Sequence, residues 1–258
     1  MMKLNSRLLW LTCVFSISVG WSQNRASDSL KQLLKNATHD TTRCKILNEM
    51  IEAETDDNIW PAYNEQLKNL AGDNLRDNAN SPYLAKFYKK YLAAAYNNIG
   101  YFKMNQGDLV QTLDFYRQSL QIQKEIDDKQ GMVSTLINIG FIYESQGNIP
   151  LALDFYHQSL KICEQANDKV GVANALNNIA VIYQKQFDAK ALDYYERSLK
   201  IYTELHDEIG ISSSYNNLGS IYELKKEPLK ALDYYTKSLA IKEKLGNKRG
   251  IAEGLNNV

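Results

Sequence analysis

The chain has 258 residues, and its 30 lysines and arginines balance 30 aspartates and glutamates, so the formal net charge is zero. This length is enough for one large domain or for an extended repeat array with a substantial apolar core. The balanced charge argues against a nucleic-acid binder, which usually carries a clear basic excess.

The first 22 residues have the pattern of a secretory signal peptide. Lys3 and Arg7 precede an apolar run that ends at Gly20, and the small residue Ser22 stands before the expected cleavage point. The alternative is an uncleaved membrane anchor, but the run is shorter than the roughly 20 apolar residues that a bilayer requires. We therefore expect residues 1–22 to be a signal peptide and the protein to be exported, to the periplasm.

Two cysteines, Cys44 and Cys163, follow the leader, which is too few for a disulfide framework. We expect two free, partly buried thiols. No apolar run after the leader is long enough to cross a bilayer, so no membrane span is expected in the mature chain.

Residues 23–80 are expected to form an N-terminal helical cap with a divergent hairpin. Helical patterns are predicted over residues 29–37 and 42–54, and a third helix over residues 58–70, after Trp60-Pro61. Ser81-Pro82 then has the pattern of an N-cap with proline at the first helical position, which begins a long helix.

Self-similarity dominates residues 81–258. An asparagine-containing motif recurs at steps of 40, 40 and 39 residues and begins a fifth time near the last residue. Its copies start at Tyr96, Leu136, Leu176, Tyr215 and Leu255. A second motif of the type Ala-Leu-Asp-aromatic-Tyr follows each of the first four copies. Both motifs lie on apolar patterns of helical period, so we predict four pairs of antiparallel helices and the start of a truncated fifth.

The helix starts and turns of these repeats can also be predicted. An Asp or Asn precedes each first helix, and a glycine follows three residues later, which suggests an N-cap and a close helix crossing. The expected caps are Asp128, Asp168, Asp207 and Asn247. One residue is missing near Gln186-Phe187, where the glycine of the other turns is also absent.

The order of small residue, Tyr, Ala and Tyr, as in Gly140, Tyr143, Ala152 and Tyr156, resembles the tetratricopeptide repeat family. The period of 40, longer than the usual 34, is similar to that of kinesin light chains and Pins-type adaptors. The resemblance implies an all-α, right-handed superhelical solenoid of antiparallel helix pairs. It also implies a protein or peptide partner in a concave groove.

The whole chain also resembles the N-terminal sensory region of exported bacterial signalling proteins with such repeats. In those proteins a histidine kinase, a nucleotide cyclase or a helix-turn-helix output follows the repeats. This implies an exported sensory or adaptor module with an effector beyond residue 258. The alternatives are a free-standing exported scaffold with no output domain and a membrane histidine kinase or cyclase of which this chain is one part.

The first helix of each repeat should turn a polar face away from its core, at 100° per residue. The expected partner-binding residues are Asn98, Tyr101, Ser134, Asn138, Phe141, Asn174, Asn178, Lys185, Ser213 and Asn217. Asparagine recurs at one position although it is a weak helix former, which indicates either ligand contact or ties between neighbouring repeats. Tyr101 and Phe141 are the expected apolar anchors.

No residue set in the sequence indicates catalysis. One Asp per repeat is expected to be solvated or bonded to a helix, and the second Tyr of each pair to lie in the core. These residues are Asp114, Asp154, Asp193 and Asp233, and Tyr116, Tyr156, Tyr195 and Tyr235. The three histidines stand apart from any cysteine or carboxylate pattern that binds zinc. We therefore expect no cofactor, no metal site, no nucleic-acid partner and no enzyme activity.

Overall fold

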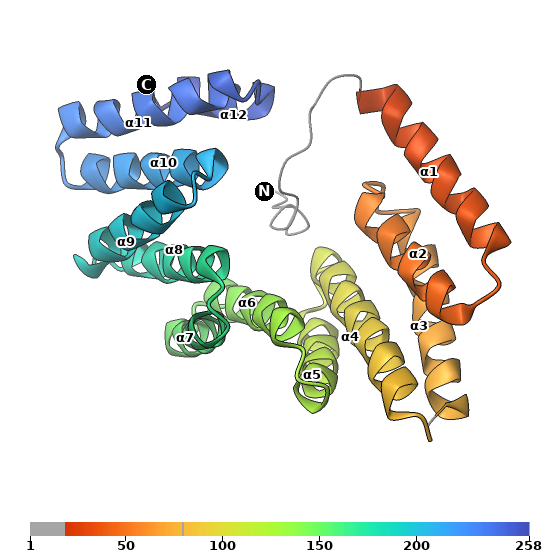
Figure 1. The fold of residues 1–258 in the computed structure, drawn as a ribbon. Coiled ribbons are helices and arrows are strands. Elements are labelled where there is room, and N and C mark those ends of the chain that lie inside the picture. Colours follow the sequence, from red (N-terminus) through yellow and green to blue (C-terminus); the bar gives the residue numbers. More distant parts are fainter. Residues whose placement is uncertain (1–18, 79, 258) are drawn as a thin grey trace. The chain divides into compact units, whose positions relative to one another are not determined.

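The computed structural model describes residues 19–78 and 80–257, and within them the backbone forms α-helices and no β-strand (Figure 1). The predicted all-α class is confirmed. The chain divides after Asp128 into two compact units. Residues 1–18 of the predicted signal peptide lie outside the described residues, so its cleavage stays a prediction.

The first unit contains five helices in its described part. They are α1 (Val19–Asn36), α2 (Asp40–Ala53), α3 (Trp60–Asp77), α4 (Pro82–Asn105) and α5 (Leu109–Glu125). Helix α3 runs to Asp77, well beyond the predicted end at residue 70. Helix α4 begins as predicted, because the Ser81 hydroxyl accepts a hydrogen bond from the backbone N–H of Leu84 and Pro82 takes the first helical position.

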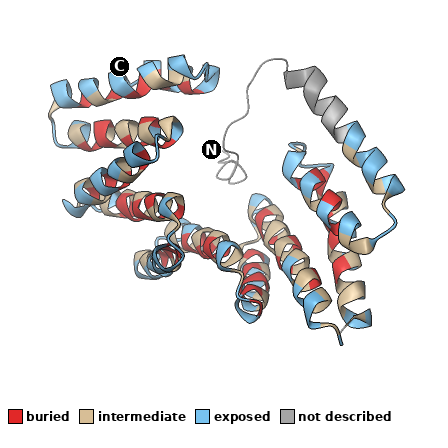
Figure 2. Ribbon diagram, viewed as in Figure 1, coloured by how far each residue is buried: buried red, intermediate tan, exposed pale blue. Residues whose placement is uncertain are grey.

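The second unit repeats one helix pair. Its helices are α6 (Lys129–Ser145), α7 (Ile149–Gln165), α8 (Lys169–Lys185), α9 (Lys190–Glu204), α10 (Glu208–Leu224), α11 (Pro228–Lys244) and α12 (Lys248–Leu255). Consecutive helices pack against each other, and their buried residues face the partner helix (Figure 2). The predicted antiparallel helix pairs are confirmed.

Side-chain caps fix the starts of the first helices in this unit. Asp168 and Asn247 each accept a hydrogen bond of 2.9 Å from the N–H of the glycine three residues later. Asp207 does the same for Gly210 at 3.1 Å. These three caps confirm the sequence pattern, and each satisfies a backbone N–H in the first turn of its helix.

A glycine on the first helix of a pair makes room for a tyrosine ring on the second. A Cβ added at Gly140 would lie 2.6 Å from the ring of Tyr156, and one at Gly219 would lie 2.6 Å from that of Tyr235. The first unit has the same arrangement at Gly100 and Tyr116. All of the second tyrosines of the pairs are buried, as predicted.

The third repeat, formed by α8 and α9, departs from this pattern in two ways. Ala180 replaces the glycine and packs in the core with Tyr195. Helix α9 has 15 residues, whereas α7 and α11 have 17. The turn before α9 keeps its geometry, since Phe187 takes the left-handed conformation that Gly147 has in the second repeat. The missing residue therefore belongs to the start of α9, after Phe187.

Candidate functional site

The recurring asparagines connect the first helices of neighbouring repeats. In the second unit, the Asn217 side-chain amide donates a 2.8 Å hydrogen bond to the Asn177 side-chain oxygen. Asn257 donates to Asn216 in the same way, at 3.0 Å. Of the two predicted roles for these asparagines, the tie between repeats is therefore the one that Asn217 performs.

The first unit uses its asparagine similarly. Asn98 donates a 2.9 Å hydrogen bond to the side-chain oxygen of Asn64 on α3, and Asn64 donates to the backbone oxygen of Ala95 on α4. Asn64 is buried, so both of its polar ends are satisfied inside the protein. Asn98 thus holds α3 and α4 together and does not present a free amide.

Asn178 is the exception among the predicted groove asparagines. Each tie runs from the third residue of one motif to the second residue of the preceding motif, which is an asparagine in both cases. For Asn178 that earlier residue is Ile137, which has no side-chain acceptor. Asn178 is half-buried, and its side chain makes no hydrogen bond to a described residue.

Other predicted groove residues differ in their surroundings. The Asn174 side-chain oxygen accepts a 2.6 Å hydrogen bond from the Tyr202 hydroxyl, and the Ser134 hydroxyl donates to the backbone oxygen of Gln130 at 3.3 Å. Ser213 is exposed on α10. Asn138 is half-buried on α6.

The two predicted apolar anchors have different environments. Phe141 is 40% exposed on α6, so its ring is open to a partner. Tyr101 is only 6% exposed, and its ring packs 6.4 Å, centroid to centroid, from the ring of Trp60. The expectation that Tyr101 faces the groove is therefore wrong. Trp60 covers it from α3, a helix outside the repeat pattern from which Tyr101 was placed.

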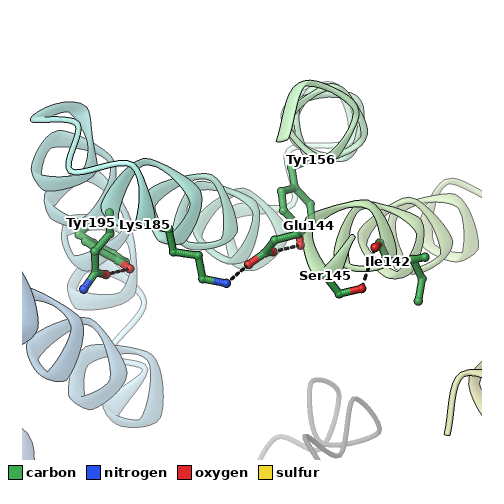
Figure 3. Close-up of polar contacts among 7 residues, drawn as sticks. Ile142, Glu144, Ser145, Tyr156, Lys185 and Tyr195 are labelled. Carbon is green, nitrogen blue, oxygen red and sulfur yellow. Dashed lines mark hydrogen bonds and ion pairs between the residues drawn. The ribbon is translucent and has the colours of Figure 1, made fainter. Parts of the chain in front are cut away.

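Lys185 is paired within the molecule. Its ammonium group lies 2.5 Å from a carboxylate oxygen of Glu144, and the Tyr156 hydroxyl donates to the other carboxylate oxygen at 2.8 Å (Figure 3). The Glu144 side chain is 9% exposed. Burial and the neighbouring negative charge of Glu144 raise the pKa of Tyr156 above its ordinary value. The charge of Lys185 is thus neutralised, and the ion pair joins α6 to α8.

Glu144 is not among the predicted groove residues, although the sequence contains a signal for it. The residue 11 or 12 positions before the core tyrosine is an acceptor in three repeats: Tyr195 donates to Gln184 and Tyr235 to Glu223, as Tyr156 does to Glu144. In the first repeat this position is Met104, and the buried hydroxyl of Tyr116 has no hydrogen-bond partner.

Two pairs of aromatic residues in the second unit pack against each other. Tyr143 stacks on Phe155, and Tyr222 on Tyr234, with ring centroids 5.5 and 5.4 Å apart. Their faces are occupied by one another, which leaves little ring surface for an external sugar or base.

The repeated aspartates are bonded within their own helices. Asp154 accepts a 2.8 Å hydrogen bond from Gln158, and Asp233 pairs with Lys237 at 2.6 Å, both four residues ahead. Within the described residues, no group of three or more His, Cys, Asp or Glu side chains is placed to hold a metal ion. These aspartates are therefore bonded to side chains of their own helices.

The two cysteines are free and buried, as predicted. Burial raises the pKa of Cys44 to about 12 and that of Cys163 to about 11. A thiol that keeps its proton is a poor nucleophile, so neither is activated for chemistry. Of the helices that the structure describes, none combines the length and apolar character needed to cross a membrane.

A sequence model of the family described as Tetratricopeptide repeat matches residues 91–165 and 171–244, more than half of the chain. No curated protein matches the sequence.

Solved structures match the fold at low sequence identity. BtubC (BKLC) from P. vanneervenii has a TM-score of 0.67 and 18% identity, over 88% of this chain and 90% of that one. The quorum sensor NprR from B. thuringiensis, in its apo form, has a TM-score of 0.56 and 19% identity, over 91% and 63%. A signal transduction ATPase with a tetratricopeptide repeat sensor, PH0952 from Pyrococcus horikoshii, has a TM-score of 0.60 and 16% identity, over 93% and 43%. At these identities the likeness supports the fold alone.

Proposed function

Since the chain belongs to the tetratricopeptide repeat family, we propose that it is an interaction module that binds a peptide or protein on the exposed face of α6 and α8. The fold is consistent with a protein-interaction module. One observation carries the choice of this face: Asn178 has a free amide where the equivalent Asn217 is bonded to its neighbour.

The chemistry of this face suits a polypeptide backbone. A side-chain amide offers both donors and an acceptor, so Asn178 can pair with an N–H and a C=O of a bound chain. The pairing register of the asparagines places Asn178 opposite Ile137, one helical turn before Phe141 on α6. Phe141, with its ring 40% exposed, then supplies apolar surface for a side chain of the partner.

The proposal extends to an exported sensory or adaptor role. Its support is the leader pattern of residues 1–22 together with structural neighbours described as a quorum sensor and as the repeat sensor of a signalling ATPase. The effector proposed for such a sensor would lie beyond residue 258. The 40-residue period supports the long-repeat subtype as a further part of this proposal.

A matched set of variants tests the binding face. Peptides selected by the wild-type chain from a displayed random library should lose binding to Asn178→Ala and to Phe141→Ala. They should keep binding to Val110→Ala, an exposed site in the first unit. Selected peptides that bind all four proteins equally would show that the face of α6 and α8 is not the binding site.

The export component needs a separate test. N-terminal sequencing of the protein from the native cell envelope should give a chain that starts at Gln23. Recovery of intact Met1 from the membrane fraction would contradict cleavage and support an anchor.

A further inference from the structure

The turns between the two helices of each repeat share a left-handed residue but differ in its identity. In the first two repeats this residue is Gly107, with φ of +82°, and Gly147, with φ of +75°. In the third and fourth repeats it is Phe187, with φ of +55°, and Lys226, with φ of +59°. Glycine adopts this conformation freely, whereas a bulky side chain is strained by contact with its own backbone.

Packing does not offset the strain at Phe187. Its side chain is 81% exposed, so the aromatic ring is nearly surrounded by solvent. Leu229, at the start of α11 just after the next such turn, is 83% exposed. A residue with a strained backbone and a solvent-exposed apolar side chain does not stabilise the fold, which indicates that it has a functional role.

The two turns lie on one edge of the second unit. Near the end of α8, Gln184 donates a 2.8 Å hydrogen bond to Ser220 of α10, so the ends of these two helices are neighbours. The turns that leave them, before α9 and before α11, both point to the left in Figure 1. The turn that contains Phe187 and the turn that precedes Leu229 therefore lie on the same edge.

Lysines surround both apolar tips. Residues 185–190 contain two lysines and one aspartate, and the equivalent residues 224–229 contain two lysines and one glutamate. Lys226 forms no ion pair with a described residue, whereas Glu227 lies 2.6 Å from Lys230. The equivalent residues 105–110 and 145–150 contain no lysine or arginine. The exposed apolar tips of the third and fourth repeats thus have lysines near them, and because Glu144 neutralises Lys185, the excess of positive charge lies in the fourth repeat.

We propose that this edge, defined by Phe187, Lys190, Lys226 and Leu229, docks on an anionic lipid bilayer. Apolar tips enter the interface between headgroups and acyl chains, and lysines beside them interact with negatively charged headgroups. A bilayer suits this edge better than a protein does. Phe187 and Leu229 are more than four-fifths exposed, so the protein around them forms no pocket for a partner's side chain. A bilayer needs no such pocket, because the exposed side chain itself inserts into the lipid.

Sedimentation of the full chain with vesicles tests this docking. The vesicles contain equal parts of phosphatidylcholine and phosphatidylglycerol. A Phe187→Gly, Leu229→Ser double variant should partition onto them at least tenfold less than the wild type, because two buried apolar side chains are lost. Lys226→Gly should lower partition about fivefold on these vesicles, and not on pure phosphatidylcholine.

Controls separate this edge from the rest of the chain. Val110→Ser removes a side chain that is 82% exposed, at the start of α5 after a turn without lysines, and should leave partition unchanged. The apolar run before residue 23 is common to all variants, so differences between them report the edge. The proposal is overturned if the double variant partitions like the wild type or if Val110→Ser loses as much.

A second probe distinguishes a protein partner. A synthetic helical peptide with glutamate on one face and leucine on the other is titrated against the same proteins. Binding that the double variant loses, together with unchanged partition onto vesicles, would replace the lipid surface by an acidic protein partner.

Discussion

The hydroxyl of Tyr156 donates a 2.8 Å hydrogen bond to Glu144, and this bond fastens the second helix of a repeat to the first. Tyr195 and Tyr235 make the same kind of bond to Gln184 and Glu223. Tyr116 is buried without one, because Met104 stands at the acceptor position. Equivalent tyrosines thus differ in what their hydroxyls contribute to the stability of the fold.

Removal of the hydroxyl should therefore have opposite effects at the two sites. Tyr156→Phe should lower the free energy of unfolding by about 1.5–3 kcal/mol, since a mostly buried carboxylate loses a donor. Tyr116→Phe should leave it unchanged or raise it, because the buried hydroxyl is already unsatisfied. Urea unfolding of both variants measures the difference.

Met104→Gln should have the converse effect and raise the free energy of unfolding. It places an amide acceptor where the other repeats have one and should stabilise wild-type Tyr116 but not Tyr116→Phe. Equal destabilisation by both tyrosine substitutions, with no benefit from Met104→Gln, would show that hydroxyl pairing does not decide their contributions.

The repeat architecture could be predicted from the sequence because each repeat has its own local signals. The period gives the helix pairs, Asp168 and Asn247 give helix starts, and the glycine and tyrosine positions give the core. These features depend on residues close in sequence. They can therefore be predicted without knowing how distant helices pack.

The details of the site depend on contacts between repeats and could not be predicted in the same way. Tyr101 is covered by Trp60, which belongs to a helix without the repeat pattern. Whether an asparagine is free depends on the residue 40 or 41 positions earlier, and this offset was known only once Asn217 and Asn177 were seen to pair. Lys185 was predicted to add charge to the groove, but Glu144 neutralises it.

Replacement of Phe187 by glycine should stabilise the protein. The left-handed conformation costs a bulky residue about 1–2 kcal/mol, and the exposed ring loses no packing when it is removed. Part of this gain is offset because glycine makes the unfolded chain more flexible, so we expect a net gain of about 0.5–1 kcal/mol. Thermal unfolding measures it, and Gln186→Gly, next to it in the same turn, is the control. A lower melting temperature for Phe187→Gly would contradict the assigned strain.

Stability should fall as the pH rises above about 9. Unfolded thiols ionise near pH 8.5, whereas burial holds the pKa of Cys44 at about 12 and that of Cys163 at about 11 in the folded protein. Above the unfolded pKa the native state binds more protons than the unfolded state, so the free energy of unfolding decreases as pH rises. The full contribution is present below about pH 8.5.

The slope of the free energy of unfolding against pH shows whether the thiols cause this loss of stability. Each should contribute up to about 1.4 kcal/mol per pH unit between pH 9 and 10, before the unfolded tyrosines ionise. Cys44→Ala and Cys163→Ala should each make the free energy of unfolding depend less steeply on pH between pH 9 and 10. This holds even if the substitution also changes the free energy of unfolding at neutral pH. An unchanged slope in the double variant would assign the alkaline loss to other groups.

The contrast between Asn178 and Asn217 separates binding from stability. Asn217→Ala removes a hydrogen bond between repeats and should lower the free energy of unfolding by about 0.5–1.5 kcal/mol. Asn178→Ala removes no such bond and should leave the melting temperature close to that of the wild type. The added variant Ile137→Asn restores an acceptor at the position that Asn178 would reach. It should tie Asn178 to α6 and so reduce binding of selected peptides while it keeps or raises stability. If Asn178→Ala instead unfolds as easily as Asn217→Ala, Asn178 has a structural role and the proposed binding face loses its main support.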